Sequence, residues 1–245
     1  MQRFFIAPSQ INNNIAEITG SDARQIQKVL RSKIGDKLIV CDGTEKAYDA
    51  EISAINKGTV SLKILRELNE ETESTAKITL AQCLPKGSKM DFIIQKSVEL
   101  GVFDIIPIIS ERSIPKISDK SEKKQERWQK IAKEAAEQSG RLIIPQVHPI
   151  QSFDDLLKSS NKYDLKMIPW ELEKENRLRA KLQMVGTGRD LSLLIIVGPE
   201  GGFSQNEIKS AKSAGFIPIT LGKRILRTET APIAILSNIF YELDS

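Results

Sequence analysis

The chain has 245 residues, of which 40% are hydrophobic and 28% charged, and it carries a formal net charge of +4. This length is enough for one large domain or for two modest domains that each bury a core. No apolar run approaches the roughly 20 residues that span a bilayer, and the N-terminus lacks the apolar core of a signal peptide, so we expect a cytoplasmic protein without membrane association.

Residues suited to metal binding or to histidine chemistry are scarce. Cys41 and Cys83 are far apart in the chain, and His148, the single histidine, precedes a proline in a predicted loop. A zinc site normally needs three or four such ligands. A Ser–His or Cys–His pair could form only through His148, which stands in no supporting motif. The sequence therefore predicts no metal site and no histidine base.

The first 68 residues are predicted to be mostly strands. β-prone segments occur at 3–7, 37–43 and 47–55, and the Asp42–Gly43 turn between the last two indicates a hairpin. One helix is predicted at 22–31, with Ser21 as its cap and with Ile26, Val29 and Leu30 on one face. An acidic, polar run then predicts a linker over 67–76.

From Lys77 onward, predicted strands alternate with predicted helices, which favours a mainly parallel sheet with helices on both faces. The most apolar strand, 191–197, is the expected central strand. Predicted caps are Ser88, Ser204 within the capping box "SQNE", and Thr230. The strands are expected at 77–83, 103–109, 142–147, 164–170, 191–197 and 217–221, and the helices at 88–101, 121–140, 153–159, 171–183, 204–215 and 231–243.

Two loops of this alternating region have unusual sequences. The first, "GPEGGF" at 198–203, has neither the Lys-Ser/Thr of a phosphate loop nor a dinucleotide fingerprint, and Glu200 would repel an anion. Its three glycines allow the backbone to approach a flat or bulky ligand that is neutral or cationic. An ordinary strand–helix turn is the alternative. The second loop, at 222–232, places Arg227 and Glu229 beside apolar Ile225 and Leu226, which indicates a site that combines an apolar wall with charged chemistry.

These loops, "GPEGGFSQNEI" followed by "LGKRILRTETA", resemble the signature of the RsmE family, SPOUT-class enzymes that methylate N3 of a uridine in 16S ribosomal RNA. Further similar segments cover nearly the whole chain in the expected order. They lie at 3–6, 29–43, 48–52, 84–102, 111–113 and 134–147.

The resemblance implies a PUA-like RNA-binding β-barrel at 1–70 and a SPOUT α/β domain with a parallel sheet and a C-terminal trefoil knot at 71–245. It also implies a homodimer that acts on 16S ribosomal RNA of the small subunit, with S-adenosylmethionine as methyl donor. The implied cofactor residues, several of which would act through backbone groups, are Pro169, Trp170, Glu171, Val197, Gly198, Glu200, Gly201, Leu221, Gly222, Ile225 and Leu226.

Methyl transfer to uridine N3 spreads negative charge over the ring oxygens, which a guanidinium stabilises. Arg227 is the first candidate for that role, and Glu229 either orients Arg227 or accepts the proton. Alternatively, Glu229 only pairs with an arginine and caps the last helix. Arg141 is a further catalytic candidate that would serve the partner subunit's site. Gln25 stands where many family members have a histidine, a departure that concerns RNA contact.

Affinity for structured RNA is expected to come largely from phosphate contacts by basic side chains. The candidate RNA contacts are Arg3, Arg24, Arg31, Lys86 and Lys89. Solvated surface charge is the alternative for each of them.

Two other functions stay open: another SPOUT activity, such as ribose 2′-O-methylation of transfer RNA, and a non-catalytic RNA-binding ribosome assembly factor. A nucleotide-hydrolysing enzyme has less support.

Overall fold

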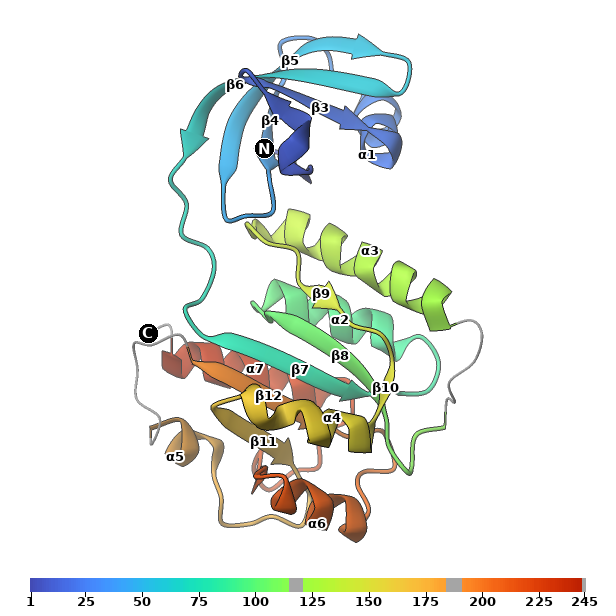
Figure 1. Ribbon diagram of the computed structural model, residues 1–245, viewed down its shortest axis with the longest axis vertical. Coiled ribbons are helices and arrows are strands. Elements are labelled where there is room, and N and C mark those ends of the chain that lie inside the picture. Colours follow the sequence, from blue (N-terminus) through green and yellow to red (C-terminus); the bar gives the residue numbers. More distant parts are fainter. Residues whose placement is uncertain (115–120, 184–190, 244–245) are drawn as a thin grey trace. The chain divides into compact units, whose positions relative to one another are not determined.

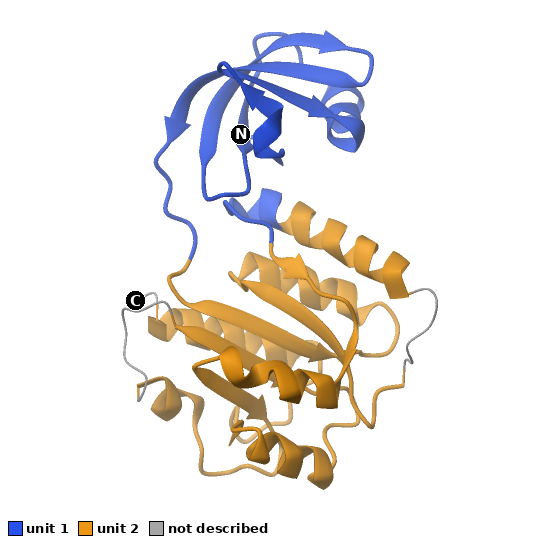
Figure 2. Cartoon of the chain, viewed as in Figure 1, with its two compact units in different colours: residues 1–73, 136–144 blue, residues 74–135, 145–245 orange. Residues whose placement is uncertain are grey.

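The computed structural model describes residues 1–114, 121–183 and 191–243. They form two compact units, coloured separately in Figure 2. Unit 1 comprises Met1–Glu73 and Ala136–Ile144, and unit 2 comprises Ser74–Ala135 and Pro145–Ser245. The domain limits expected from the sequence, 1–70 and 71–245, do not assign residues 136–144 to the N-terminal unit. These domain limits stay predictions.

Unit 1 is built on a six-stranded sheet of order β1-β4-β5-β6-β3-β2 (Figure 1). β1 pairs with β4 in parallel and the remaining neighbours are antiparallel. The predicted hairpin is confirmed, since β4 and β5 are antiparallel neighbours joined at Asp42–Gly43. The ladder leaves β1 and β2 as its two edges, so it does not by itself form a closed barrel. The strands are β1 (Arg3–Phe5), β2 (Ile11–Asn12), β3 (Ile15–Thr19), β4 (Lys37–Cys41), β5 (Ala47–Asn56) and β6 (Thr59–Leu68).

The predicted helix of unit 1 is present but differs in winding and in its cap. It begins as α1 (Gly20–Arg24) and continues as a π-helical turn, Gln25–Val29. Thr19 rather than Ser21 occupies the N-cap position, and no side chain caps the helix there. The wider turn changes the angle between successive residues. Val29 therefore does not share the face of Ile26 as predicted: Ile26 is fully buried, whereas Val29 is 73% exposed.

Unit 2 contains a seven-stranded sheet in which all described pairings are parallel, so the predicted sheet type is confirmed. Its order is β10-β8-β7-β12-β11-β13, with β9 beside β8. The apolar strand β12 is central, as predicted, and its middle residues are fully buried. The strands are β7 (Lys77–Cys83), β8 (Asp104–Ile109), β9 (Gln146–Val147), β10 (Gln151–Ser152), β11 (Leu165–Pro169), β12 (Ser192–Val197) and β13 (Ile217–Ile219).

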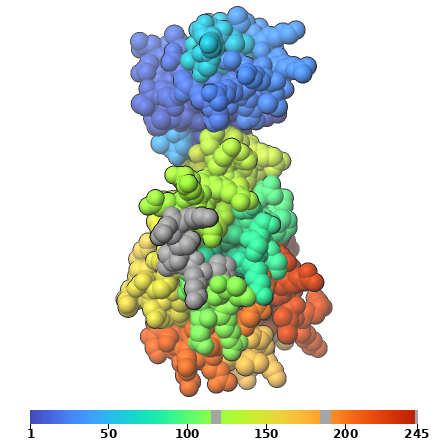
Figure 3. All heavy atoms as spheres, turned by 90° about the vertical axis from the view of Figure 1, so that its right-hand side faces the viewer, coloured from blue at the N-terminus to red at the C-terminus, as the bar shows by residue number. Residues whose placement is uncertain are grey.

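Helices cover both faces of this sheet. α4 and α6 lie over one face, where Leu156 and Ile208 pack with Ile108 and Ile196 of the strands (Figure 1). On the other face α2 packs against α7, and Figure 3 shows the surfaces of these two helices side by side, in green and red. The helices are α2 (Lys89–Glu99), α3 (Ser121–Ser139), α4 (Phe153–Ser159), α5 (Leu178–Gln183), α6 (Gln205–Ser213) and α7 (Thr230–Leu243).

Three expectations in this region were wrong: the extent of one strand, the extent of one helix and the cap of α7. The predicted strand 142–147 is reduced to β9, and the predicted helix 171–183 is helical only from Leu178. The side chain of Glu173 accepts hydrogen bonds from the backbone N–H groups of residues 174–176, and these bonds form a turn where a helix was expected. Thr230 is the first residue of α7 rather than its cap.

Candidate active site

One cavity lies at the carboxyl ends of neighbouring strands of unit 2. Ligands in α/β sheets characteristically bind at this edge. The loops that follow β11, β12 and β13, together with the first residue of α2, enclose a volume of about 540 Å³. The structure brings all eleven predicted cofactor residues together around it. They are Pro169, Trp170, Glu171, Val197, Gly198, Glu200, Gly201, Leu221, Gly222, Ile225 and Leu226.

Close packing explains two glycines of the loop after β12. A Cβ atom on Gly198 would lie 3.0 Å from the ring of Phe203, and one on Gly201 would lie 3.2 Å from Cβ of Arg112. Both distances are shorter than most real Cβ contacts, so a side chain at either position requires the neighbouring atoms to shift. Ser204 then opens α6 through the predicted capping box: its hydroxyl accepts from the N–H of Glu207, whose carboxylate accepts from the N–H of Ser204.

A turn after β8 supports the same loop from outside the cavity. Arg112 Nη1 donates to the carbonyl of Gly201 at 2.9 Å. The Ser204 hydroxyl donates to Glu111 Oε2 at 2.7 Å, and the N–H of Glu111 donates to Glu207 Oε1 at 2.8 Å. The segment 111–113, noted in the sequence only for its resemblance, therefore fixes the glycine loop to the sheet edge.

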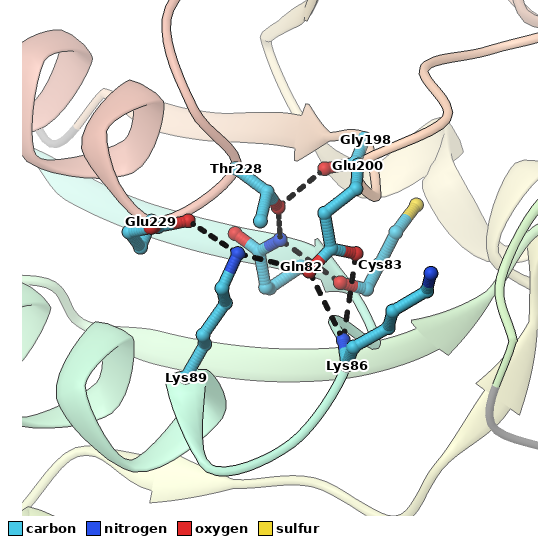
Figure 4. Close-up of polar contacts among 8 residues, drawn as sticks. All are labelled: Gln82, Cys83, Lys86, Lys89, Gly198, Glu200, Thr228 and Glu229. Atoms are coloured by element: carbon cyan, nitrogen blue, oxygen red, sulfur yellow. Dashed lines mark hydrogen bonds and ion pairs between the residues drawn. The ribbon is translucent and has the colours of Figure 1, made fainter.

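Thr228 connects the loop after β13 to the loop after β12 (Figure 4). Its hydroxyl donates to the carbonyl of Gly198 at 2.7 Å and accepts from Gln82 Nε2 at 3.1 Å. Gln82, at the end of β7, is fully buried and also donates to the carbonyl of Cys83 at 2.9 Å. Among the described residues, no donor is hydrogen-bonded to Gln82 Oε1.

Lys89 bridges two carboxylates beside the cavity (Figure 4). Its Nζ atom lies 3.1 Å from Glu200 Oε1 and 3.1 Å from Glu229 Oε2. The second contact has the distance of an ion pair, but within the described chain Glu229 Oε2 has no partner that satisfies hydrogen-bond geometry. The N–H of Lys86 also donates to Glu200, at 3.2 Å.

The electrostatics of this cluster favour the charged form of each group. Contacts with Glu200 and Glu229 raise the pKa of Lys89. Burial opposes ionisation of Glu200, but hydrogen bonds from its own N–H, from Lys89 and from Lys86 outweigh burial and lower its pKa. The pKa of Glu229 is also lowered, first by its own N–H and then by Lys89 and Arg227. The cluster therefore carries two negative charges and one positive charge at neutral pH.

The catalytic candidates fall into two places. Arg227 lines the cavity. Glu229 does not line it but contacts Lys89, which does. Arg141 belongs to unit 1, where its side chain is only 5% exposed and donates to Glu73 from Nε at 3.1 Å and from Nη2 at 2.5 Å. A catalytic role for Arg141 stays a prediction, and that ion pair would have to break for the side chain to reach a substrate.

The five candidate RNA contacts also differ in their surroundings. Arg24, Arg31 and Lys86 are exposed. Arg3 is largely buried and pairs with Glu70 at 2.8 Å, so its charge is already matched within unit 1. Lys89 is the bridging residue of the carboxylate cluster. Phosphate contact is a prediction for all five, and the geometry supports it best for the three exposed ones.

A second cavity of about 920 Å³ adjoins the first and shares part of its wall, including Glu171 and the loop after β13. Its other walls come from α5 and α7, where Arg179 pairs with Glu242 at 3.4 Å. Within 1–114, 121–183 and 191–243, no group of three or more His, Cys, Asp or Glu side chains could hold a metal ion. Nor is any helix in those ranges both long and apolar enough to cross a membrane.

Comparisons with known proteins match both parts of the chain. An RNA methyltransferase domain family matches residues 72–240, and an RNA methyltransferase PUA domain family matches 18–65. Ribosomal RNA small subunit methyltransferase E of Bacillus subtilis is 38% identical over 250 residues, covering 100% of this chain and 98% of that protein. The chain belongs to the RsmE family of RNA methyltransferases.

Two solved structures extend the similarity to the fold. A ribosomal RNA small subunit methyltransferase E from Neisseria gonorrhoeae, bound to S-adenosyl methionine, has a TM-score of 0.88 and 34% identity and covers 99% of this chain and 98% of its own. A methyltransferase structure from Legionella pneumophila, in complex with the bound cofactor SAM, has a TM-score of 0.84 and 34% identity, with 98% and 96% covered. The PUA-like β domain and the parallel-sheet methyltransferase domain of this RsmE-family chain are thereby established.

Sequence reasoning missed several residues of this RsmE-family site. Gln82 has a visible signal, since it is a polar residue near the end of the apolar strand 77–83, and Thr228 lies within a loop that was singled out. Their contact joins residues far apart in the chain and could not be read from local patterns. Other residues that line the cavity without having been predicted are Pro199, Gly202, Phe203, Thr220, Lys223, Arg224 and Ala231.

Proposed function

We propose that this protein transfers a methyl group from S-adenosylmethionine to N3 of a uridine in 16S ribosomal RNA. One observation carries the proposal: residues from three separate loops, expected to bind the cofactor, line a single cavity of about 540 Å³. Cavities of roughly 300–1,000 Å³ accommodate cofactor-sized ligands. The names of the relatives from Bacillus subtilis and Neisseria gonorrhoeae support the substrate class and the cofactor.

The residues present fit this cofactor. Gly198 and Gly201 line the cavity without side chains of their own, so peptide groups of the loop after β12 can contact a nucleoside. Leu226 contributes apolar surface. Glu200 and Glu171 supply negative charge to a wall that faces a positively charged ligand. When bound, S-adenosylmethionine supplies a methyl group on a positively charged sulfur.

The chain's own residues then act on the uridine. Transfer forms an N3–methyl bond, breaks the sulfur–methyl bond and requires the N3 proton to leave. The Arg227 guanidinium lines the cavity and can stabilise the negative charge that develops on the ring oxygens. Glu229 is ionised, so it can accept the proton directly or through water, or orient Arg227.

Further properties belong to the same proposal. We infer a homodimer, because the RsmE resemblance implies one, and a trefoil knot formed by the loops around the cavity. Residues 1–70 and 71–245 are the proposed limits of the RNA-binding and methyl-transfer domains. A substrate in the small ribosomal subunit also implies action in the cytoplasm.

Calorimetric titration with S-adenosylmethionine tests the cofactor proposal, and transfer of a tritiated methyl group to small-subunit RNA tests the reaction. Digestion to nucleosides followed by fragmentation in a mass spectrometer separates the two SPOUT products: N3-methylation leaves the methyl group on the released base, whereas ribose 2′-O-methylation leaves it on the sugar. We expect a methylated base.

Gly201→Trp is the variant expected to block cofactor binding. Its side chain begins 3.2 Å from Cβ of Arg112, so it displaces the loop, and saturable binding should disappear while the protein stays folded. Failure of the folded wild-type protein to bind the cofactor would favour the alternative, a non-catalytic RNA-binding assembly factor.

A further inference from the structure

The segment from Gln82 near the end of β7 to Lys89 at the start of α2 contacts both loops of the cavity at two separate points. The first point is buried and runs from Gln82 through Thr228 to Gly198. The second is partly exposed and runs from Glu200 through Lys89 to Glu229. In the first bridge Thr228 joins the loop after β13 directly to the loop after β12, and Gln82 holds the Thr228 hydroxyl in place. In the second bridge Lys89 itself lies between the two loops (Figure 4).

The buried bridge has a defined direction. The carbonyl of Cys83 can only accept a hydrogen bond, so the side chain of Gln82 must present Nε2 to it at 2.9 Å. The same Nε2 donates to the hydroxyl of Thr228, whose own hydrogen then goes to the carbonyl of Gly198. Because Gln82 is fully buried, no water competes for these bonds.

The exposed bridge places a positive charge where the helix itself disfavours one. Lys89 is the first residue of α2, and a cation at a helix N-terminus opposes the helix dipole. The two carboxylates compensate at 3.1 Å each. The side chain of Lys89 therefore faces the cavity cluster and is already engaged there.

We propose that Thr228, held in place by Gln82, and Lys89 are positioning residues that join the two cavity loops and thereby preorganise the cavity for the cofactor. Lys89 acts within this site and not as a phosphate contact. The inference rests on the proposed cofactor, and its physical basis is preorganisation: loops already joined lose less conformational freedom when a ligand binds between them.

Cofactor titration in the absence of RNA tests the buried bridge. Thr228→Val keeps the shape of the side chain but removes its hydroxyl, so the dissociation constant for S-adenosylmethionine should rise about tenfold. Thr228→Ser keeps the hydroxyl and should stay within about twofold of wild type. Titration well below the unfolding temperature, checked by circular dichroism, separates loosened loops from global unfolding.

Lys89→Met tests the exposed bridge, and Lys89→Arg should restore most of the affinity because it can still reach both carboxylates. We expect Lys89→Met to weaken cofactor binding about threefold to tenfold. Lys96→Met is the matched control, since Lys96 lies on the same helix and pairs with Glu99, and it should leave the dissociation constant unchanged.

Two results would overturn the inference. If Lys89→Met leaves cofactor affinity unchanged and raises only the KM for RNA, Lys89 is a phosphate contact. If Thr228→Val binds the cofactor as tightly as wild type, the buried bridge does not position the loops. Failure of the wild-type protein to bind the cofactor would instead refute the proposed function itself, and the inference with it.

Discussion

Arg227 and Glu229 are two residues apart in the loop that leads into α7, yet their surroundings differ. Arg227 is exposed and lines the cavity, whereas Glu229 contacts Lys89 and has one oxygen without a hydrogen bond from any described residue. An exposed guanidinium near an ionised carboxylate suits a reaction in which N3 loses its proton while negative charge spreads onto the two ring oxygens that flank it.

Arg227→Gln should slow methyl transfer about 100-fold, because the developing charge on the uridine oxygens then loses the guanidinium proposed to stabilise it. Cofactor affinity should change little, since the proposed role of Arg227 concerns the RNA base. Single-turnover transfer from a tritiated donor, with cofactor titration in parallel, separates the two effects. Unchanged transfer would exclude Arg227 from the chemistry.

The ionisation of Glu229 predicts a pH dependence. Its own N–H, Lys89 and Arg227 lower its pKa. The proton-accepting form is therefore fully present at neutral pH and disappears only as the pH falls through the lowered pKa. If Glu229 is the base, the transfer rate should be flat between about pH 6 and 8.

Glu229→Gln supplies the comparison. Without the carboxylate, hydroxide must remove the N3 proton, and the rate should rise about tenfold per pH unit over the same range. Such a slope in the wild-type protein, with no further change in the variant, would show that Glu229 only orients Arg227 or caps the helix.

At the scale of elements, the capping box of α6 does two jobs. Ser204 starts the helix and also donates to Glu111 of the turn after β8. Ser204→Ala should cost about 1 kcal/mol of unfolding free energy. Ser210→Ala, on the exposed part of the same helix, should be near neutral. Thermal unfolding should show a fall of about 2–4 °C in Tm for the first variant only, and equal Tm values would exclude a role for the cap.

Local chemistry made some elements predictable and tertiary contacts hid others. The capping box at Ser204 and the apolar run of β12 act through neighbouring residues, so sequence reasoning found both. The turn at Glu173 depends on a side chain that competes with helical hydrogen bonding, and helical periodicity alone predicted the wrong structure there. The cavity wall was predicted through resemblance, but the Gln82–Thr228 contact was not, because 146 positions separate its partners.

At the scale of the whole molecule, we expect unit 1 to contribute to RNA binding and unit 2 to bind the cofactor, and the two roles can be measured separately. Arg24 and Arg31 are exposed on unit 1. Replacing both with Gln should weaken RNA binding and lower the salt dependence, by about 0.7–0.9 in log–log slope for each phosphate that is no longer neutralised. Cofactor affinity should not change, because the cavity belongs to unit 2. An unchanged salt slope would mean that neither residue contacts phosphate.

Because unit 1 includes residues 136–144, its folding depends on how much of the chain has been synthesised. Glu73, the last residue of the first segment of that unit, binds the Arg141 guanidinium and accepts from the N–H of Leu142 at 2.8 Å. When only the first 73 residues have left the ribosome, neither of these donors has yet emerged. The N-terminal unit can therefore complete its own structure only after more than half of the protein has been translated, so its two segments should acquire protection from proteolysis together and not in order of synthesis.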